Sequence, residues 1–587
     1  MIKSKNTHLF RTACLSLLLL IATVPFASQS LSAQETATQE QVERYESVKD
    51  ALQSRGKLSG DGGPSNVNWI DDGDRYSYTE YNSETKSKEI WAYNPDTDEK
   101  KRIFTTDGVT YPDTDSSFTY RSFQWSKDSK YLLFQTNFRP VYRKSGISDY
   151  YLYSLENESL QLVVEDARTA ELSPDGSKVA YERDADMFVY DLSSKDETRL
   201  TDSATDKVYN GRFGWVYEEE FGLPQAWRWS PDSKHIAFWQ TDESDVPIFK
   251  MTDYSGLHIK YEKIPYPQVG DTNPDVRIGV VNVNNGNLEW MDVDGSEGYI
   301  PRVYWTSNPE KLAVVHLNRP QRHLKLFFTD INSGKSRLVM EEKRTDGWID
   351  VFDFFAGVDH LFYFPKTMEQ FFWVSDRNGW NHIYRYSYNG ELRNKVTDGK
   401  WEVTKVHEVD PGSNTIYFNA TKETPLERHL YSINFDGSGM NKHTRKKGHH
   451  SIDFSPNTRY YIDRYSNTTT PRQVELWNTD GKMLKKLVDN EQVSEYIDKH
   501  FYAYKELINF KTEDGQQLDG YVIKPPEFDP TKEHPLFLNI YGGPGAQSVY
   551  NDFHTSPWIQ YLVQQGYVVA GVNNRGSGGY GRDFEKI

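Results

Sequence analysis

The sequence predicts a mainly β protein, in which a β-propeller is followed by the beginning of a domain with a parallel sheet. Three observations support this fold class. A strand–turn–strand pattern recurs between residues 60 and 490. Aromatic residues make up 14% of the chain, with 15 Trp and 39 Tyr, which is enough for a substantial core. After about residue 496 the pattern changes to strands that alternate with a helix.

The first 33 residues have the composition of a secretory signal peptide. Lys3, Lys5 and Arg11 form a basic start, an apolar run follows from Leu15 to Phe26, and small residues lead up to Ala33. We therefore expect an exported protein, periplasmic or extracellular, with the signal cleaved near Ala33. The apolar run is too short to span a bilayer comfortably, so we expect no stable membrane span after signal removal.

A helical segment is expected between residues 34 and 60. The stretch from Thr38 to Gln53 begins with a T-x-x-Q capping box, which is typical of a helix start. Apolar residues then recur at helical spacing, which predicts one amphipathic helix. These apolar positions are Val42, Tyr45, Val48 and Leu52.

The region from 61 to 490 is predicted to form the propeller. The clearest copies of its repeat are FQWSKDSKYLLF from Phe123, AELSPDGSKVAY from Ala170 and WRWSPDSKHIAF from Trp227; weaker copies begin at Val67, Val303, His407 and Ser451, and a degenerate one lies around Phe364. These eight copies lie about 55 residues apart on average, which suits propeller blades. A pair of β-sandwiches is the alternative, because turn signals alone also fit that fold.

Residues 491–587 are predicted to start a different domain. ELINFKTEDGQQLDGYVIKPP indicates a β-hairpin turned at Asp514 and Gly515, and LFLNIY indicates a short strand. TSPWIQYLVQQGYVVAGV indicates a helix that ends at Gly566, followed by an apolar strand. Two such steps do not complete a parallel sheet covered on both faces, so we expect only the first part of a domain.

Composition and motifs exclude several classes of function. The formal net charge of −17 argues against nucleic-acid binding. The only cysteine, Cys14, lies in the signal, so the mature chain is expected to have no disulfide, thiolate metal site or catalytic cysteine. The sequence contains neither H-E-x-x-H nor a Walker loop. We expect no metal and no cofactor.

Three motifs are more specific than the fold class. They are GWVYEEEFG from Gly214 to Gly222, IYGGPG from Ile540 to Gly545 and NNRGSGGYG from Asn573 to Gly581. With these motifs the mature chain resembles the dipeptidyl peptidase IV branch of the prolyl oligopeptidase family of serine peptidases. The resemblance implies an eight-bladed β-propeller followed by the first part of an α/β-hydrolase domain. It also implies an exopeptidase that releases X-Pro or X-Ala dipeptides from peptides with a free amino terminus.

The acidic triplet of the first motif is the main candidate for substrate binding. Aromatic residues flank Glu218, Glu219 and Glu220, so we expect a packed segment, although a run of acids is most often a solvated face. Two carboxylates held close repel each other, and a cation such as an α-ammonium between them relieves that repulsion. By resemblance, Glu219 and Glu220 bind the substrate amino terminus, and Glu218 is expected to face elsewhere.

An arginine is expected to assist this clamp. Arg143, in FRPVYRKSG, corresponds to the family's arginine that binds a substrate carbonyl near the amino terminus. A guanidinium suits a carbonyl or carboxylate acceptor better than the ammonium of Lys144 would. Arg139 is the rival, and a surface salt bridge is the alternative role for either arginine.

A tyrosine is the candidate for oxyanion stabilisation. Tyr541 ends the strand LFLNIY and precedes GGPG. In the family the matching hydroxyl stabilises the tetrahedral oxyanion, and a buried tyrosine at a strand end is the alternative. In the third motif Asn573 stands where the family often has aspartate, which leaves open whether that loop gives polar support.

The sequence offers no catalytic triad. A G-x-S-x-G elbow followed by an acid and a histidine is expected, but Ser438 and Ser577 both lack the first glycine. We therefore expect a C-terminally truncated chain that lacks the catalytic Ser, Asp and His and has no peptidase activity. The alternative is a non-catalytic propeller that binds peptide amino termini. A homodimer of the full-length protein is compatible with the resemblance.

Overall fold

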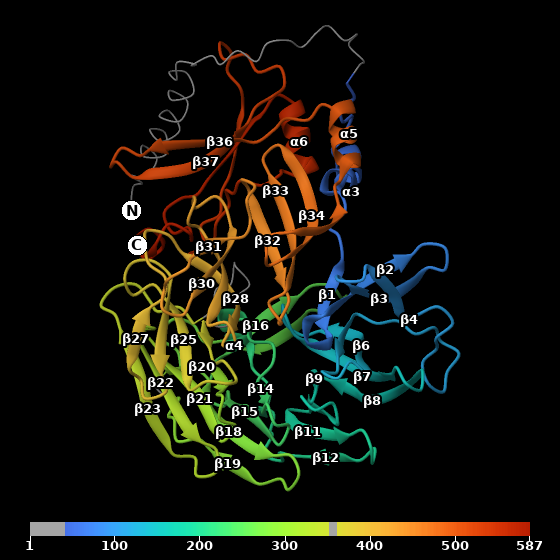
Figure 1. Ribbon diagram of the computed structural model, residues 1–587, viewed down its shortest axis with the longest axis vertical. Helices are drawn as coiled ribbons and strands as arrows, with labels where there is room; N and C mark the ends of the chain where they lie inside the picture. The colour runs from blue at the N-terminus through green and yellow to red at the C-terminus, as the bar shows by residue number, and fades with distance from the viewer. Residues whose placement is uncertain (1–41, 297, 352–360, 587) are drawn as a thin grey trace.

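The structure is a computed structural model that describes residues 42–296, 298–351 and 361–586. Eight antiparallel sheets follow one another along the chain and surround a common centre, and a smaller unit of strands and helices lies above them (Figure 1). The fold is therefore an eight-bladed β-propeller followed by the first part of an α/β-hydrolase domain, as the sequence predicts. The predicted signal peptide lies outside the described residues.

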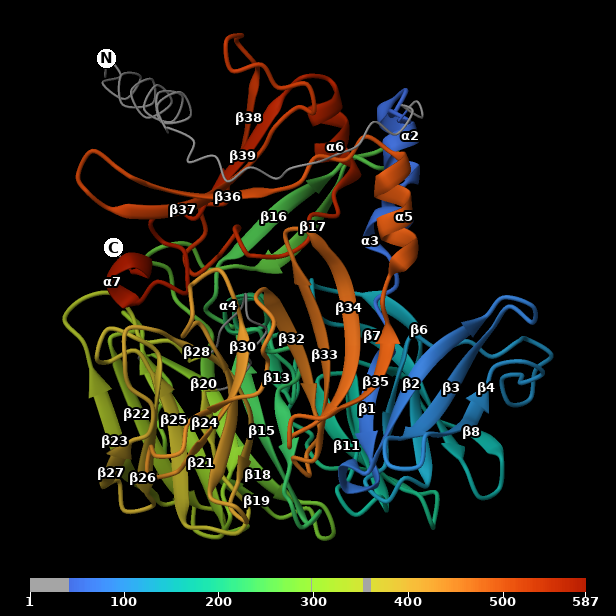
Figure 2. The same cartoon turned by 45° about the horizontal axis from the view of Figure 1, so that its top comes forward.

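The first four blades occupy residues 65–290. Their strands are β1 (Ser65–Ile70), β2 (Arg75–Asn82), β3 (Ser87–Asn94) and β4 (Glu99–Thr105); β5 (Ser122–Trp125), β6 (Tyr131–Pro140), β7 (Gly146–Ser154) and β8 (Ser159–Ala167); β9 (Thr169–Leu172), β10 (Lys178–Arg183), β11 (Asp186–Asp191) and β12 (Glu197–Arg199); and β13 (Val208–Asn210), β14 (Trp227–Trp229), β15 (His235–Asp242), β18 (Asp275–Asn282) and β19 (Leu288–Trp290). A separate hairpin, β16 (Ile248–Asp253) and β17 (Lys260–Pro265), leaves the fourth blade toward the hydrolase segment (Figure 2).

The last four blades occupy residues 298–488. Their strands are β20 (Gly298–Trp305), β21 (Lys311–Asn318), β22 (His323–Asp330) and β23 (Ser336–Lys343); β24 (Phe362–Tyr363), β25 (Gln370–Ser375), β26 (His382–Ser387) and β27 (Leu392–Lys395); β28 (Val403–Asp410), β29 (Thr415–Ala420), β30 (His429–Asn434) and β31 (Asn441–Lys442); and β32 (His449–Phe454), β33 (Tyr460–Asn467), β34 (Thr470–Asn478) and β35 (Met483–Val488). Each repeat copy in the sequence forms two neighbouring strands of one blade, with β24 and β25 on either side of the degenerate copy.

The serine of the repeat closes the turn between these two strands in four blades. Its hydroxyl oxygen accepts a hydrogen bond of 2.9 to 3.0 Å from the backbone N–H that opens the second strand. The hydroxyl then donates to an Asp or Asn side chain two residues further on, at 2.6 to 2.8 Å. The four serines are Ser126, Ser173, Ser230 and Ser455. The repeat is therefore recognisable because each turn is stabilised locally.

Side chains join the first blade to the last. Within the described residues, no strand is shared between the two sheets. Tyr76 packs with Tyr460 and Val474 in one apolar cluster. At the rim, Arg459 forms ion pairs with Asp74 at 2.9 Å and Asp96 at 2.7 Å. Packing and charge pairing thus close the ring.

The hydrolase segment contains one four-stranded sheet. Its strands lie in the order β36 (Glu506–Lys511), β37 (Gln517–Ile523), β39 (Val568–Val572) and β38 (Leu536–Asn539), and β38 pairs with β39 in parallel. Helix α6 (Pro557–Gln564) packs its apolar side chains against this sheet. The predicted hairpin, helix and final strand are confirmed. Two further helices are α5 (Glu491–Lys499) and α7 (Arg582–Glu585).

Within its described part, the helix predicted from Thr38 to Gln53 is confirmed only for the last six residues. The chain forms two short helices, α2 (Val48–Gln53) and α3 (Arg55–Ser59), and the Ser47 hydroxyl caps the first by accepting from the Asp50 N–H at 3.1 Å. Before them, the Glu43 backbone bonds to Lys499 and Phe501 as an extended segment. This pairing overrides the helical periodicity. Of the four predicted apolar positions, only Tyr45 is buried, and Val42, Val48 and Leu52 are exposed.

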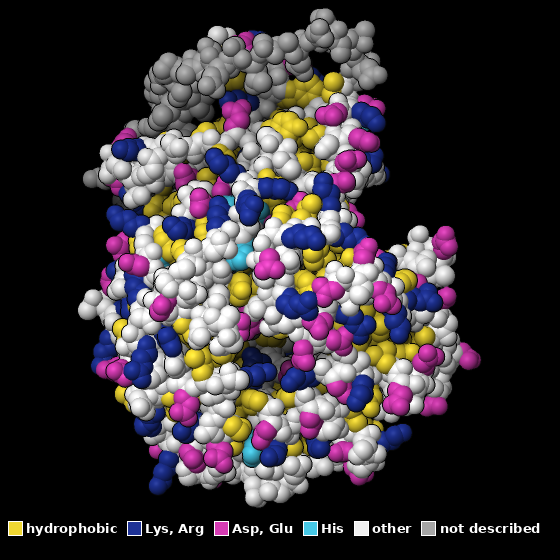
Figure 3. All heavy atoms as spheres, viewed as in Figure 1, with side chains coloured by type: hydrophobic (Ala, Val, Ile, Leu, Met, Phe, Trp, Pro, Cys, Tyr) yellow, Lys and Arg dark blue, Asp and Glu magenta, His cyan; other side chains and the backbone are white. Residues whose placement is uncertain are grey.

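The described helices and the charges on the surface bear on membrane association. Among the helices of the described ranges, none combines the length and the apolar character that crossing a bilayer requires. On the face shown in Figure 3, acidic and basic side chains are interspersed among the described residues.

Candidate functional site

The acidic triplet lies on α4 (Trp215–Phe221), a short helix between the first two strands of the fourth blade. Figure 2 shows this helix on the side of the propeller that faces the hydrolase segment. Tyr217 and Phe221 are buried, and the ring of Tyr217 stacks on Phe213 with centroids 4.9 Å apart. Gly222 ends the helix at a φ of 67°, a conformation that favours glycine. The predicted packing of the triplet on aromatic residues is confirmed.

The three glutamates of this helix have different surroundings. Glu218 is buried, with 2% of its surface exposed, and faces away from solvent as expected. The Glu219 carboxylate pairs with the Arg143 guanidinium, with Oε1 and Nη2 2.9 Å apart. Glu220 is exposed, although the surrounding protein partly desolvates its carboxylate. This desolvation is the larger cause that raises the pKa of Glu220, and the negative charge of Glu219 is the smaller one. A cation near Glu220 would relieve both effects.

Arg143 and its rival Arg139 have different partners. Arg139 pairs with Asp166, and both side chains are exposed. Arg143 lies beside the acidic helix and lines a cavity between the propeller and the hydrolase segment, which is described below. Arg139 is not among the residues that line this cavity. Of the two arginines, only Arg143 therefore lies at the cavity.

A cavity of about 760 Å³ lies between the propeller and the hydrolase segment. Arg143, Glu219 and Glu220 line it from the propeller, and Tyr541 lines it from the hydrolase segment. Tyr541 follows β38 and exposes 53% of its surface, so the alternative of a buried strand-end tyrosine is wrong. The structure thus brings all four candidate residues to one cavity, although more than 300 positions separate Tyr541 from the acidic helix.

The loop that begins at Asn573 supports the GGPG segment. Gly545 donates its backbone N–H to the Gly576 carbonyl at 2.7 Å. The buried Asn573 side chain accepts from the N–H groups of Ser548 and Val549 at 3.0 and 2.8 Å. The asparagine that replaces the family's aspartate therefore provides polar support, which the sequence left open.

Two propeller residues hold these loops, and the sequence analysis missed both. The Glu402 carboxylate accepts from the backbone N–H groups of Gly579 and Gly581 at 3.0 and 2.8 Å. Arg428 donates to the side-chain carbonyl of Gln547 at 2.6 Å. Neither residue belongs to one of the three specific motifs, and a single acid or arginine in a blade carries no local signal of such a contact.

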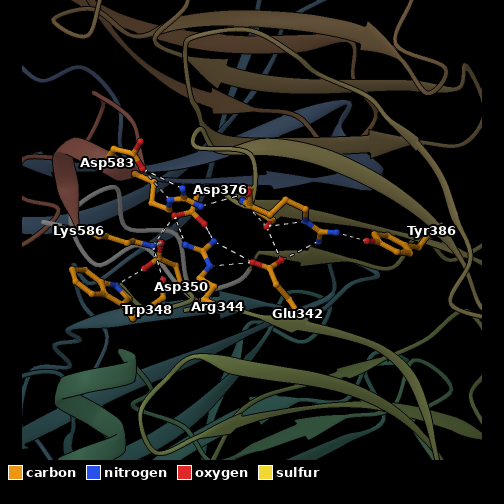
Figure 4. Close-up of polar contacts among 11 residues, drawn as sticks. Glu342, Arg344, Trp348, Asp350, Asp376, Tyr386, Asp583 and Lys586 are labelled. Atoms are coloured by element: carbon orange, nitrogen blue, oxygen red, sulfur yellow. Dashed lines mark hydrogen bonds and ion pairs between the residues drawn. The ribbon is translucent and has the colours of Figure 1, made fainter. Parts of the chain in front are cut away.

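A buried charge network joins the end of the described chain to the propeller (Figure 4). The Lys586 ammonium donates to Asp350 at 2.6 Å, to Asp376 at 2.8 Å and to the Trp348 carbonyl at 3.0 Å. Arg344 forms a further ion pair with Asp376. Lys586 follows the loop that begins at Asn573 and supports the GGPG segment. The network therefore helps to hold this side of the cavity against the blades. The sequence analysis did not identify it.

No group of three His, Cys, Asp or Glu side chains in the described part of the chain is arranged to hold a metal ion. The side chains that line the cavity offer two kinds of chemistry. Two carboxylates and a guanidinium at one wall can bind a cationic group that carries a carbonyl acceptor. The phenol of Tyr541, which lines the cavity from the hydrolase segment, can donate a hydrogen bond to an oxygen that becomes negative.

Family models match the two parts of the chain separately. Residues 126–472 match the dipeptidyl peptidase IV (DPP IV) N-terminal region, and residues 553–587 match the prolyl oligopeptidase family. Dipeptidyl peptidase 4 of Trichophyton tonsurans is 29% identical over 79% of this chain and 62% of its own length. Dipeptidyl peptidase 4 of Arthroderma otae is 30% identical over 78% of this chain and 61% of its own length.

A solved structure extends the comparison to nearly the whole chain. The crystal structure of Porphyromonas gingivalis dipeptidyl peptidase 4 superposes with a TM-score of 0.82 at 29% identity, and the match covers 93% of this chain and 76% of that one. The chain spans about three-fifths of the length of the two fungal relatives.

Proposed function

Because the chain belongs to the dipeptidyl peptidase IV branch of the prolyl oligopeptidase family, we propose that it is part of an exported serine exopeptidase. This enzyme releases X-Pro or X-Ala dipeptides from peptides with a free amino terminus. The observation that carries the proposal is the cavity that Arg143, Glu219, Glu220 and Tyr541 line together.

The electrostatics of the clamp suit one α-ammonium group. Arg143 and Glu219 form a charge-balanced pair, which leaves Glu220 as the carboxylate without balance within this group of three. An incoming ammonium restores neutrality and is held by charge-assisted hydrogen bonds. A blocked or internal peptide segment brings no such charge. The clamp therefore fixes the register of the peptide from its amino terminus.

Tyr541 has the role of an oxyanion donor in this proposal. Tyr541 lines the cavity from the hydrolase segment. In this proposal its hydroxyl donates to the carbonyl oxygen of the scissile bond, which becomes negative during attack. Removing one such donor costs about 10²- to 10³-fold in kcat. We propose that the 587 residues, which contain no G-x-S-x-G elbow, do not cleave peptides by themselves.

The test compares this chain with the product of the complete coding sequence, using X-Pro and X-Ala chromogenic substrates. The complete product is expected to cleave both, and Tyr541→Phe is expected to lower kcat about 10²-fold or more. Turnover by the 587-residue chain, abolished by a serine-directed phosphonate, would contradict the assignment of the triad. A complete product that binds free-amine peptides without cleaving them would support the non-catalytic alternative.

A further inference from the structure

We propose that Glu218, the buried first acid of the triplet, is a positioning residue that holds Arg143 beside the amino-terminus clamp. The proposal rests on the proposed function, because it explains how the clamp is assembled. Glu218 does not line the cavity, so it is not itself a ligand of the substrate.

The first step is a direct tie between the acidic helix and the loop that carries Arg143. Glu218 Oε1 accepts hydrogen bonds from the backbone N–H groups of Lys144 and Ser145, at 2.8 and 2.9 Å. These two residues follow Arg143 directly. The neighbouring Glu219 pairs with the Arg143 side chain from the same helix. Adjacent carboxylates therefore hold the backbone and the side chain of one short segment.

The second step is the compensation of a buried charge. A carboxylate as buried as Glu218 is costly unless hydrogen bonds and an opposite charge stabilise it. Arg168 supplies that charge, with its Nη2 3.8 Å from Glu218 Oε2, and the same Nη2 donates to the Ser145 hydroxyl at 2.8 Å. Arg168 thus holds the loop from the other side. Glu218, Glu219 and Arg168 together hold the loop between β6 and β7 against α4.

The third step concerns the mobility of Arg143. Its side chain is 66% exposed, so packing alone does not select one rotamer. Long arginine side chains lose considerable conformational entropy when they are fixed. A loop held at Lys144 and Ser145 restricts where the Arg143 guanidinium can reach, which lowers the entropy lost on binding. Without the tie, Arg143 would spend less time beside Glu219, and the clamp would bind an ammonium less well.

The test uses hydrogen exchange and peptide binding in the same variants of the protein. Glu218→Ala removes the acceptor, whereas Glu218→Gln keeps a side-chain oxygen that can accept both N–H groups. Glu475→Ala is the matched control, because Glu475 is 3% exposed and accepts from Lys446 and Trp477 on the last blade, and does not line the cavity. The probes are alanyl-proline amide and its N-acetyl form.

Glu218→Ala is expected to speed amide exchange in residues 141–147 at least tenfold and to weaken binding of the free-amine probe at least fivefold. Glu218→Gln is expected to keep both values within about twofold to threefold of the wild type. Glu475→Ala is expected to change neither. If Glu218→Ala does not fold, Glu218→Asp replaces it, since its carboxylate is one methylene shorter and loses at least one of the two bonds.

Two negative outcomes separate the inference from the proposed function. If the wild type prefers the free-amine probe and Glu218→Ala keeps that preference in full, the positioning role is overturned while the clamp stands. If the wild type binds the free and acetylated probes equally well, the proposed function fails, and the inference fails with it. Equal weakening of both probes by Glu218→Ala would also overturn the inference, because it would indicate a general loss of structure.

Discussion

Replacing Lys586 with methionine should loosen the contact between the hydrolase segment and the propeller. The Lys586 side chain is 1% exposed, and Asp376, one of its two carboxylate partners, is 6% exposed. The network contains three positive side chains, Lys586, Arg344 and Arg377. It contains three negative ones, Glu342, Asp350 and Asp376. Lys586→Met leaves one carboxylate charge uncompensated in this buried site.

The expected cost follows from the burial of these partners. Removing one member of a buried ion pair typically destabilises by about 3 to 5 kcal/mol. We expect about 3 kcal/mol here, because Asp350 is 25% exposed and water can solvate part of its charge. Lys532→Met is the control, since its ion pair with Asp529 is exposed and is worth less than about 1 kcal/mol.

Hydrogen exchange of residues 575–586 is the suitable assay, because a chain with two units need not unfold in one step. Lys586→Met should lower the local opening free energy of this segment by about 3 kcal/mol. Adding Asp350→Asn to Lys586→Met should recover part of the loss, because it removes the uncompensated charge. Protection equal to that of Lys532→Met would refute the view that this network fixes the segment.

Two further predictions concern a buried acid and the asparagine behind the GGPG segment. Burial raises the pKa of Glu182 to about 7. Between pH 4.5 and 7 the folded state therefore holds a proton that the unfolded state has lost. The free energy of unfolding falls as the pH rises through that window. In the wild type, the free energy of unfolding should fall by on the order of 1 to 3 kcal/mol between pH 5 and 8, and Glu182→Gln should remove this fall. Urea unfolding at several pH values measures it, and the same pH dependence in both proteins would contradict the prediction. Asn573→Asp should lower the melting temperature, because the Asn573 amide donates to the Val549 carbonyl and to Tyr580, whose hydroxyl already donates to Asp519. Asn573→Asp should lower the free energy of unfolding by about 1 to 3 kcal/mol. An equal effect of Asn574→Asp would contradict the specific role of Asn573.

The propeller could be predicted because its signals are local. Four of the repeat copies carry their own turn serine, such as Ser126 or Ser230, and the hydrogen bonds of that serine reach only five residues along the chain. Such a pattern is written in consecutive residues. The stretch before Val48 was wrongly predicted as helix for the opposite reason, because periodicity cannot show the pairing of Glu43 with residues near Lys499.

The site was predictable only in part. Its aromatic packing could be inferred from the residues around Glu219, and the roles of the clamp residues came from the family resemblance. The contacts of Glu402 with Gly579 and of Lys586 with Asp350 span 177 and 236 positions. Neither a single acid nor a single lysine signals a contact over that distance. The same holds for Glu218, whose partners lie 73 and 74 positions away.

The central claim is that Glu220 and its neighbours bind a peptide's free amino group. The direct measurement is a double-mutant cycle by calorimetry, in which the wild type and Glu220→Gln each bind alanyl-proline amide and its N-acetyl form. We expect acetylation and Glu220→Gln each to cost about 1 to 3 kcal/mol, and both together to cost little more than either, because they remove the same contact. Additive losses would contradict the claim and would mean that the acidic triplet only supports the fold.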